Sequence, residues 1–453
     1  MSPISVEIDV GEKKQPLPRP EPDTPFRILV AGDFSGGPRK IRSPLLVDRD
    51  NFEDVLARIA PELTVEWGGE KLTLRFRELD DFHPDHLFGL EPFGRLRELR
   101  DRLAEPSTFA AAAAELQGAR EQRPAQPAAP PVSGADLLRQ MMGEPARSAP
   151  PAPRESDWDR MLRDLVAPYG EARSDPRQPA LIGQVDAAIA GEMRALLHQP
   201  RFQALESAWR GLYFLIRRLE TGEDLQVYVA DLPQSEWDDL ERIAVTEAAR
   251  TPGAEPWAAI AGLYSFGSAD EESLLCLSGI AQRAGAPFLA GLAPDVVGLT
   301  RVFDRLRRSP NAQWIGLALP RFLLRLPYGK HSDATERFAF EEMPAKPEHE
   351  RYLWGNPAIA CACLLGETFS RYGWSMRPGL IQDIESLPAH VYKEDGESQL
   401  KPCAEVLLTE DAAELLLDRG FMPLLSMKGT DRVRLARFQS VADPAAPLAG
   451  RWQ

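Results

Sequence analysis

Cysteine, basic charge and long apolar runs are all scarce in this chain of 453 residues. Its four cysteines are too few for a disulfide framework, which favours a reducing compartment. Residues 1–10 lack the basic start and apolar run of a signal peptide. No stretch approaches the roughly 20 apolar residues that a membrane-spanning helix needs. These absences predict a soluble protein of the cytoplasm.

Basic side chains number 53 against 68 acidic ones, which gives a formal net charge of −15. Proteins that bind nucleic acid neutralise phosphates with clustered Lys and Arg, and anionic membrane surfaces attract basic segments. The acidic balance therefore argues against both nucleic acid and membranes as partners.

Signatures of chemistry are also missing. The turn at residues 32–37 follows a strand but lacks the Gly-Lys-Ser/Thr ending of a phosphate-binding loop, so a tight glycine turn is favoured over a nucleotide site. His83 and His86 have no third zinc ligand at a suitable spacing. No Gly-x-Ser-x-Gly motif occurs. We predict no catalytic residue, no cofactor and no metal site, and hence a protein that is not an enzyme.

Proline marks the boundary between two blocks. Nine of the 41 prolines lie between Pro106 and Pro153, in a stretch otherwise dominated by Ala, Gln, Arg and Ser. A segment this poor in large apolar groups cannot offset its own ordering entropy. The sequence therefore predicts an N-terminal domain over residues 1–105, a Pro/Ala-rich linker over 106–155 and a C-terminal domain over 156–453.

The N-terminal block is predicted to be a small α+β unit. Ile4, Val6, Ile8 and Val10 alternate with polar residues, which is strand periodicity. A proline-rich segment isolates this strand, so it must dock on a sheet edge of its own chain or of a neighbour. Four further elements are predicted here: a strand over residues 26–31, a helix over 52–59, a hairpin with its turn at 68–69, and a closing charged helix.

The C-terminal block alternates predicted strands and helices. Apolar residues between Phe202 and Leu219 recur at 3.6-residue spacing, a strong helix signal over five turns. Strands are predicted over residues 225–230, 258–264, 405–408 and 421–427, and Thr409 is predicted to cap a short helix over 412–417. Such alternation is typical of a layered α/β core. The predicted fold class is therefore α/β, with an α+β small unit and an α/β layered larger unit.

Three clusters in this block are rich in tryptophan or arginine, at 206–212, 319–329 and 353–356. The composition is typical of interaction hot spots and equally of buried ion-pair cores. Residue type alone leaves both interpretations open.

The same clusters resemble the large subunit of the bacterial type VI secretion contractile sheath. The similarity is strongest in the run HQPRFQALESAWRGL at residues 198–212. It continues, in the same order along the chain, in the segments that start at Pro320, Phe340, Leu353, Thr409 and Gly420.

The N-terminal block resembles the partner small subunit. The matching motifs are FRILVAGDFSG at residues 26–36, DRDNF at 48–52 and DFHPD at 81–85. Together the two resemblances cover nearly everything except the linker. They imply a contractile-sheath-like architecture in which a small and a large sheath subunit are fused in one polypeptide.

The resemblance implies assembly rather than catalysis. In that family, heterodimers polymerise around an inner tube on a baseplate, contract to drive the tube outward, and are recycled by a hexameric AAA+ ATPase. The expected partners are therefore other copies of the chain or other sheath subunits, an inner-tube protein, the baseplate and an AAA+ disassembly ATPase. Neighbouring protomers of the family exchange strands, which makes Ile4, Val6, Ile8 and Val10 the predicted assembly strand. Packing between the two halves is predicted to include Leu96, Leu99, Leu103, Trp209 and Tyr213.

Two departures from the family pattern leave an alternative open. The large-subunit part is expected to be shortened at its C-terminus, after the segment at residues 427–431. The ATPase-recognition helix of the family has only a weak candidate, at residues 137–142. The chain is therefore expected to form a contracting sheath or, as the alternative, to be a non-propagating regulator or cap of the same apparatus.

Overall fold

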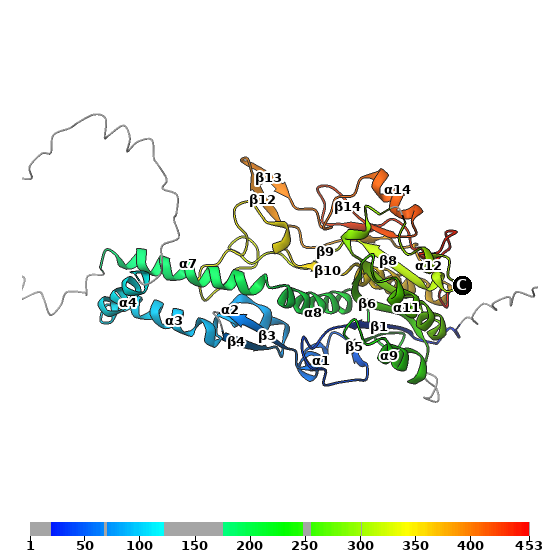
Figure 1. Ribbon diagram of the computed structural model, residues 1–453, viewed down its shortest axis with the longest axis horizontal. Coiled ribbons are helices and arrows are strands. Elements are labelled where there is room, and N and C mark those ends of the chain that lie inside the picture. The colour runs from blue at the N-terminus through cyan, green and yellow to red at the C-terminus, as the bar shows by residue number, and fades with distance from the viewer. Residues whose placement is uncertain (1–19, 68–69, 122–174, 248–254, 300, 453) are drawn as a thin grey trace, which may run out of the picture. The chain divides into compact units, whose positions relative to one another are not determined.

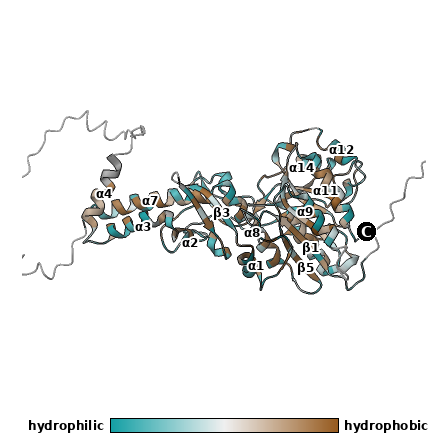
Figure 2. Ribbon diagram, turned by 60° about the horizontal axis from the view of Figure 1, so that its bottom comes forward, coloured by the Kyte–Doolittle hydropathy of each residue, from teal (hydrophilic) through white to brown (hydrophobic). Residues whose placement is uncertain are grey.

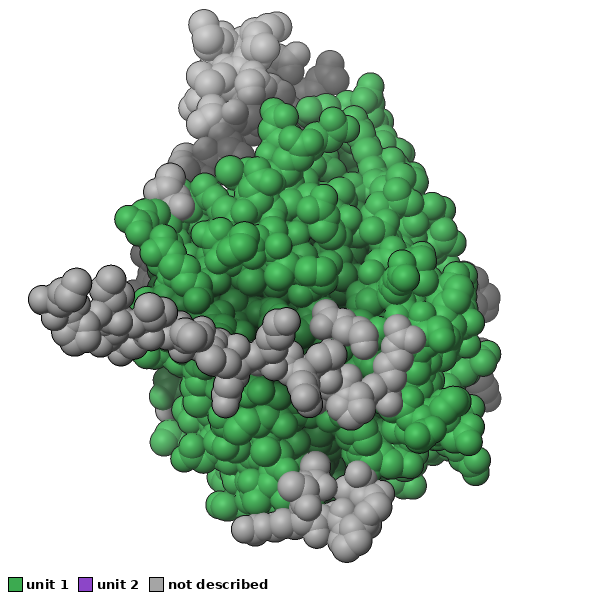
Figure 3. All heavy atoms as spheres, turned by 90° about the vertical axis from the view of Figure 1, so that its right-hand side faces the viewer, with its two compact units in different colours: residues 1–90, 192–453 green, residues 91–191 purple. Residues whose placement is uncertain are grey.

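The computed structural model of the chain describes residues 20–67, 70–121, 175–247, 255–299 and 301–452. They form two compact units, a larger one from residues 1–90 and 192–453 and a smaller one from residues 91–191. Figure 3 shows one face of the larger unit. The predicted assembly strand at residues 4–10 lies outside the described residues.

A nine-stranded sheet forms the centre of the larger unit (Figure 1). Its order is β11-β15-β14-β8-β7-β6-β1-β5-β2. The strands from β5 to β14 in this order run parallel, and the antiparallel strands β2 and β15 flank them. The bounds of the strands are β1 Phe26–Gly32, β2 Leu45–Val47, β5 Leu225–Asp231, β6 Trp257–Phe266, β7 Phe288–Leu292, β8 Ile315–Leu319, β11 Asp383–Ile384, β14 Met422–Ser426 and β15 Val433–Leu435.

Helices cover both faces of this sheet. Helix α11 (Glu271–Ala284) shares one apolar cluster with Leu29 and Ala31 of β1. Helix α13 (Pro357–Tyr372) contacts β1, β6, β7 and β8, but none of its residues belongs to that cluster. The two helices therefore cover opposite faces, and strands buried on both sides are mostly apolar, as the colouring of β1 and β5 shows (Figure 2). The predicted α/β class is confirmed.

The N-terminal block supplies a central strand of this sheet. Strand β1 pairs in parallel with β5 on one side and with β6 on the other, so Ile28 lies between Val227 and Ala259. Strand β2, from the same block, pairs with the outer side of β5. The two sequence blocks therefore complete one sheet together.

The local elements of the N-terminal block follow the sequence pattern closely. Helix α1 (Phe52–Ile59) buries the apolar stripe of the predicted helix, and β3 (Glu62–Trp67) pairs with β4 (Glu70–Arg75) as the predicted hairpin. The remaining elements of the larger unit are η1 Leu79–Phe82, α2 Pro84–Phe88, α8 Pro200–Arg218, α9 Trp237–Glu241 followed by the π-helix Arg242–Glu247, η4 Pro294–Val296, α12 Asp304–Arg307, η5 Ala312–Trp314, β9 Phe322–Leu323 paired with β10 Trp354–Gly355, η6 His349–Arg351, η7 Gly373–Ser375, β12 Val391–Glu394 paired with β13 Glu397–Leu400, and α14 Glu410–Asp418.

The strand predicted over residues 405–408 is wrong. Glu405 donates its backbone N–H to Arg321, but the residues after it pair with no strand, and Val406 and Leu407 are 50% and 51% exposed. The apolar pattern of this segment belongs to an outer loop, which leads into α14 through the predicted Thr409 cap.

The smaller unit consists of α3 (Glu91–Ala104), α4 (Phe109–Glu121) and residues 178–191 of α7 (Gln178–Leu197). Helix α4 lies inside the segment predicted to be a linker, which corrects that prediction for residues 109–121. Alanine has the highest helix propensity of all residue types, and α4 contains a run of alanines. Phe109, Ala112 and Ala113 are buried. Residues 122–155 of the predicted linker lie outside the described residues. None of the described helices combines the length and apolar character that crossing a bilayer takes.

Candidate functional site

Helix α8 carries Trp209 and Tyr213, two of the residues predicted to pack between the halves of the chain. Trp209 is fully buried, and its Nε1 donates a hydrogen bond to the carbonyl oxygen of Phe34 at 2.9 Å. Its ring meets Phe34 edge-on at 5.1 Å, and Tyr213 lies 5.1 Å from the ring of Phe52. The structure thus brings these two side chains against residues of the N-terminal block. The 3.6-residue periodicity of α8 accounts for this, because it places both aromatic residues on the buried face.

A buried ion network lies on another face of α8. The guanidinium of Arg325 binds Glu206 through Nε at 2.8 Å and Glu342 through Nη1 at 2.7 Å. Arg210 binds Glu206 at 2.7 Å and donates to the Tyr328 hydroxyl at 2.8 Å. The two glutamate side chains are fully buried. The network pins the segment at residues 325–342 to the helix, and its two acidic and two basic groups balance in charge.

The electrostatics of this network hold its charges in place. Burial alone would raise the pKa of Glu342, but the Arg325 guanidinium and hydrogen bonds from His198, Arg325 and the Tyr328 backbone outweigh it and lower the pKa to about 2. Burial also opposes the charge on Arg325, yet Glu206 and Glu342 raise its pKa well above the ordinary value. Two of the arginine-aromatic clusters of the sequence are therefore a buried ion-pair core.

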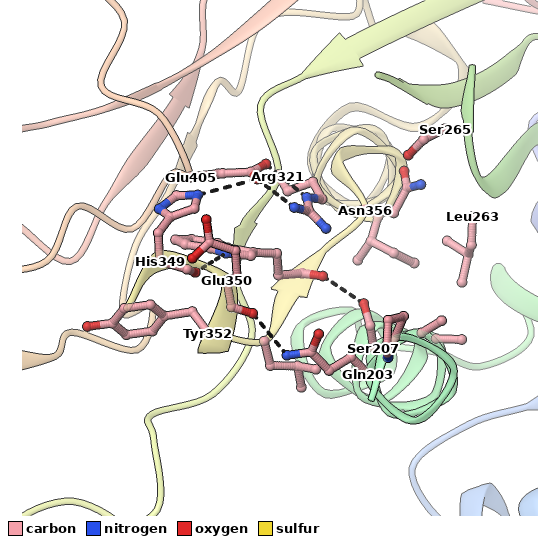
Figure 4. A pocket seen from close by; sticks show the side chains of 16 residues that line it. Gln203, Ser207, Leu263, Ser265, Arg321, His349, Glu350, Tyr352, Asn356 and Glu405 are labelled. Atoms are coloured by element: carbon pink, nitrogen blue, oxygen red, sulfur yellow. Dashed lines mark hydrogen bonds and ion pairs between the residues drawn. The ribbon is translucent and has the colours of Figure 1, made fainter. Parts of the chain in front are cut away.

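A cavity of about 510 Å³ lies between α8, the end of β6 and the segment at residues 349–356 (Figure 4). Small side chains of α8, such as Ser207, leave this space open. At its rim Arg321 binds Glu405 through two hydrogen bonds of 2.8 and 2.5 Å, and His349 Nε2 lies 3.5 Å from the same carboxylate. Burial would raise the pKa of Glu405, but Arg321 and His349 lower it. Arg321, His349 and Glu405 are thus paired with one another and support the structure, while Glu350, which also lines the cavity, is an exposed carboxylate.

The third cluster, at residues 353–356, also serves the fold. Trp354 lines the cavity and is 5% exposed. Asn356 caps α13, because its Oδ1 accepts the N–H of Ala358 while its Nδ2 donates to the carbonyl oxygen of Tyr264.

The histidines at 83 and 86 take part in local capping. Asp81 accepts the backbone N–H groups of Arg77 and Glu78 and lies 3.1 Å from His86 Nδ1. Ligand atoms of Glu78, Asp81 and His86 lie within 4.8 Å of one another, but the group is partly exposed and its aspartate already serves as a cap. His83 in turn caps α2, because its Nδ1 accepts the N–H of Asp85. The absence of a metal site here stays a prediction.

The other predicted site residues have separate locations. Leu96, Leu99 and Leu103 lie on α3 in the smaller unit, where Leu103 is fully buried. Their role in packing between the halves stays a prediction, as does that of the assembly strand outside the described residues. Sequence reasoning missed the hairpin β12–β13, although its turn residues Asp395 and Gly396 are a typical hairpin signal.

Comparisons with known proteins agree with the geometry. Residues 179–304 and 300–442 match the family model described as EvpB/VC_A0108, tail sheath N-terminal domain (VipB). Residues 19–119 match a second family, described as Type VI secretion system, VipA, VC_A0107 or Hcp2. The first match covers more than half of the chain. The second includes β1, whose two neighbouring strands lie in the first.

One curated relative is the type VI secretion system sheath protein TssC1 of Pseudomonas aeruginosa. It is 32% identical over an alignment of 306 residues, and the match covers 59% of this chain and 61% of the relative's length. Among solved structures, a chain of the anti-feeding prophage baseplate aligns over 52% of this chain and 51% of its own length, with 12% identity and a TM-score of 0.31. A likeness that slight carries no argument.

Proposed function

The chain belongs to the EvpB/VC_A0108 tail sheath family, and from that premise we propose that it is a structural subunit of a type VI secretion contractile sheath. The VipA match in the same chain makes it a fusion of small-subunit and large-subunit parts. In this role the protein polymerises around an inner tube and contracts to drive that tube outward. No observation on the described residues favours the alternative of a non-propagating regulator or cap.

The position of strand β1 is the observation that carries this proposal. Residues 19–119 and 179–442 match two different sheath families, yet β1 from the first segment lies between β5 and β6 from the second. Within the larger unit the parts of these two segments that share the sheet form one building block. Repetition of one such block through contacts between unlike surfaces generates a helical tube rather than a closed oligomer.

The contacts between copies are expected at the open edges of this sheet. Strands β2 and β11 are the edge strands, and they have only three and two residues. We propose that the alternating strand Ile4, Val6, Ile8 and Val10 pairs with a sheet edge of a neighbouring copy. An unpaired strand edge offers backbone donors and acceptors to such a segment.

The remaining parts of the role follow the same proposal. The protein acts in the cytoplasm and has a structural rather than an enzymatic role, as its membership of a tail sheath family supports. Its partners are further sheath subunits, an inner-tube protein, the baseplate and an AAA+ ATPase that takes the contracted sheath apart.

Electron microscopy of the purified full-length chain tests the proposal. The expected result is tubes or stacked rings that form above a threshold concentration. A strictly monomeric protein at high concentration would overturn it.

The assembly strand has its own matched pair of variants. Val6→Asp with Ile8→Asp places charge on the apolar face of the strand and is expected to abolish the tubes. Ser5→Asp with Asp9→Asn alters only the polar face and is expected to leave them intact. Equal effects of the two double variants would refute the role given to this strand.

A further inference from the structure

The hairpin β12–β13 projects from the larger unit (Figure 1). It forms a sheet of two strands, in which Val391 pairs with Leu400 and Glu394 with Glu397. No third strand pairs with either edge among the described residues. A two-stranded hairpin on its own is marginally stable in water. Something must therefore hold this hairpin in place.

The hairpin is anchored at its base. His390, just before β12, makes a 2.7 Å hydrogen bond through Nδ1 with the Tyr352 hydroxyl. Lys401, just after β13, donates its backbone N–H to His390 and places its ammonium 5.1 Å from the ring centre of Tyr352. The tip is a tight turn with Asp395 and Gly396 at φ of 51° and 85°. The base is fixed and the tip is free, so the hairpin is preorganised for a partner.

The tip of the hairpin carries acidic charge. Glu394, Asp395 and Glu397 lie within four residues, and Lys393 is the basic residue beside them. Lys346 forms a 2.8 Å ion pair with Glu394. Asp395 and Glu397 are exposed and form no ion pair with any residue in the described ranges. At the base of the hairpin, Val391 is an apolar side chain that is 61% exposed.

A surface of opposite character follows helix α13, at residues 371–380. Arg371 and Arg377 are exposed, and neither forms an ion pair within the part of the chain that the structure describes. Tyr372 and Leu380 are 47% and 54% exposed. The stretch from residue 368 to 382 contains no carboxylate. Exposed Arg and Tyr beside an apolar residue are typical of interaction hot spots.

The basic surface is also rigid. Trp374 in its middle is 6% exposed, donates Nε1 to the carbonyl oxygen of Thr24 at 2.6 Å, and packs on Phe26 with ring centres 5.5 Å apart. The side chain of Trp374 therefore ties this segment to Thr24 and to the start of strand β1.

We propose that the acidic tip of hairpin β12–β13 of one copy docks on the basic surface at residues 371–380 of a second copy. The charges are complementary, and the basic surface is unusual on a chain whose net charge of −15 makes copies repel one another in general. Two unlike surfaces form this contact. A pair of copies joined in this way therefore still has one unoccupied hairpin and one unoccupied basic surface, to which further copies can add. The inference rests on the proposed sheath role and names a contact through which that polymer would propagate.

A charge-swap experiment on the full-length chain tests this contact. One variant carries Asp395→Lys and Glu397→Lys, a second carries Arg371→Glu and Arg377→Glu, and a third combines all four changes. Each double reversal is expected to raise the concentration needed for polymerisation by about tenfold, because like charges then meet across the contact. The fourfold variant is expected to restore it to near the original value. The control is Glu220→Lys with Glu414→Lys, which makes the same change in net charge as the first variant at exposed residues elsewhere and should have little effect.

The outcomes separate this inference from the proposed function. Polymers that form equally well in all four variants overturn the docking contact and leave the sheath role intact. Failure of the unmodified chain to polymerise overturns the sheath role, and the contact with it. If the fourfold variant polymerises as poorly as the two double variants, this also counts against the contact, because a direct pairing of the two surfaces predicts that the combined changes restore polymerisation. Melting curves of each variant show whether a loss of folding has produced the effect.

Discussion

Replacement of Glu342 by glutamine perturbs the buried ion network at one of its two most enclosed groups. The carboxylate accepts hydrogen bonds from Arg325 and from the Tyr328 backbone, and none of its side chain is exposed. Glutamine keeps the shape and can still accept one hydrogen bond. Its amide N–H groups, however, face the donors of Arg325, so a buried charge loses half of its compensation.

The size and pH dependence of the effect follow from the lowered pKa. A shift from 4.5 to about 2 in the folded state corresponds to roughly 3 kcal/mol of stability. Because the folded pKa lies below the unfolded one, this contribution is complete above about pH 5 and is lost as the pH falls toward 2. About 1 kcal/mol should be gone by pH 4 and about 2 kcal/mol by pH 3.

Urea unfolding followed by tryptophan fluorescence measures the loss of stability and its dependence on pH. At pH 7 the Glu342→Gln variant is expected to be less stable than the parent by roughly 3 kcal/mol, and the gap should narrow by about 1 kcal/mol at pH 4. Glu414→Gln, at an exposed carboxylate of α14, serves as the control and should change stability by less than about 0.5 kcal/mol. A gap that does not depend on pH, or a variant as stable as the parent, would show that Glu342 is not held ionised by this network.

Three further predictions concern the shared sheet and its supports. Trp209→Phe removes the hydrogen bond to Phe34 and part of a buried ring, so we expect a loss of about 1–3 kcal/mol in urea unfolding; an unchanged midpoint would contradict this packing. Asn356→Ala removes the cap of α13 and should lower stability by about 1–2 kcal/mol, whereas Asn356→Asp should retain most of the cap; equal losses would show that the capping oxygen is unimportant. Cleavage at a protease site inserted within residues 122–174 should leave the two fragments together in size-exclusion chromatography until denaturant is added, because β1 lies between β5 and β6; separation without denaturant would refute this.

Local patterns in the sequence predict the local elements well. The stripe that begins at Phe52 identifies α1, and the apolar repeat from Phe202 to Leu219 identifies α8. Thr409 was predicted as a helix cap, and its side chain accepts the N–H of Ala412. Each of these signals lies within a few residues of the element that it specifies, so one segment of sequence carries the information.

Pairings between distant segments have no such signal. Glu206 and Glu342 bind the same arginine, yet 136 positions separate them, and a lone glutamate in either segment is indistinguishable from a solvated one. Strand β1 was predicted as a strand, but nothing in its sequence indicates that β5 and β6 are its neighbours. Helix α4 escapes prediction for a different reason. The prolines around it indicate a linker, whereas its own run of alanines favours a helix.

The position of β1 between β5 and β6 requires the two parts of the chain to fold together. Phe26, Ile28, Leu29 and Val30 are fully buried, and their burial contributes roughly 8 kcal/mol as an upper estimate. Without β1, the facing edges of β5 and β6 would be unpaired, and exposed apolar strand edges promote aggregation. Neither part of the chain therefore has a complete sheet without the other. A covalent connection supplies both parts in equal number and at high local concentration, so the shared sheet can form whatever the concentration of the protein. A sheath built from this chain would therefore repeat a single polypeptide, whereas a sheath of separate small and large subunits repeats two.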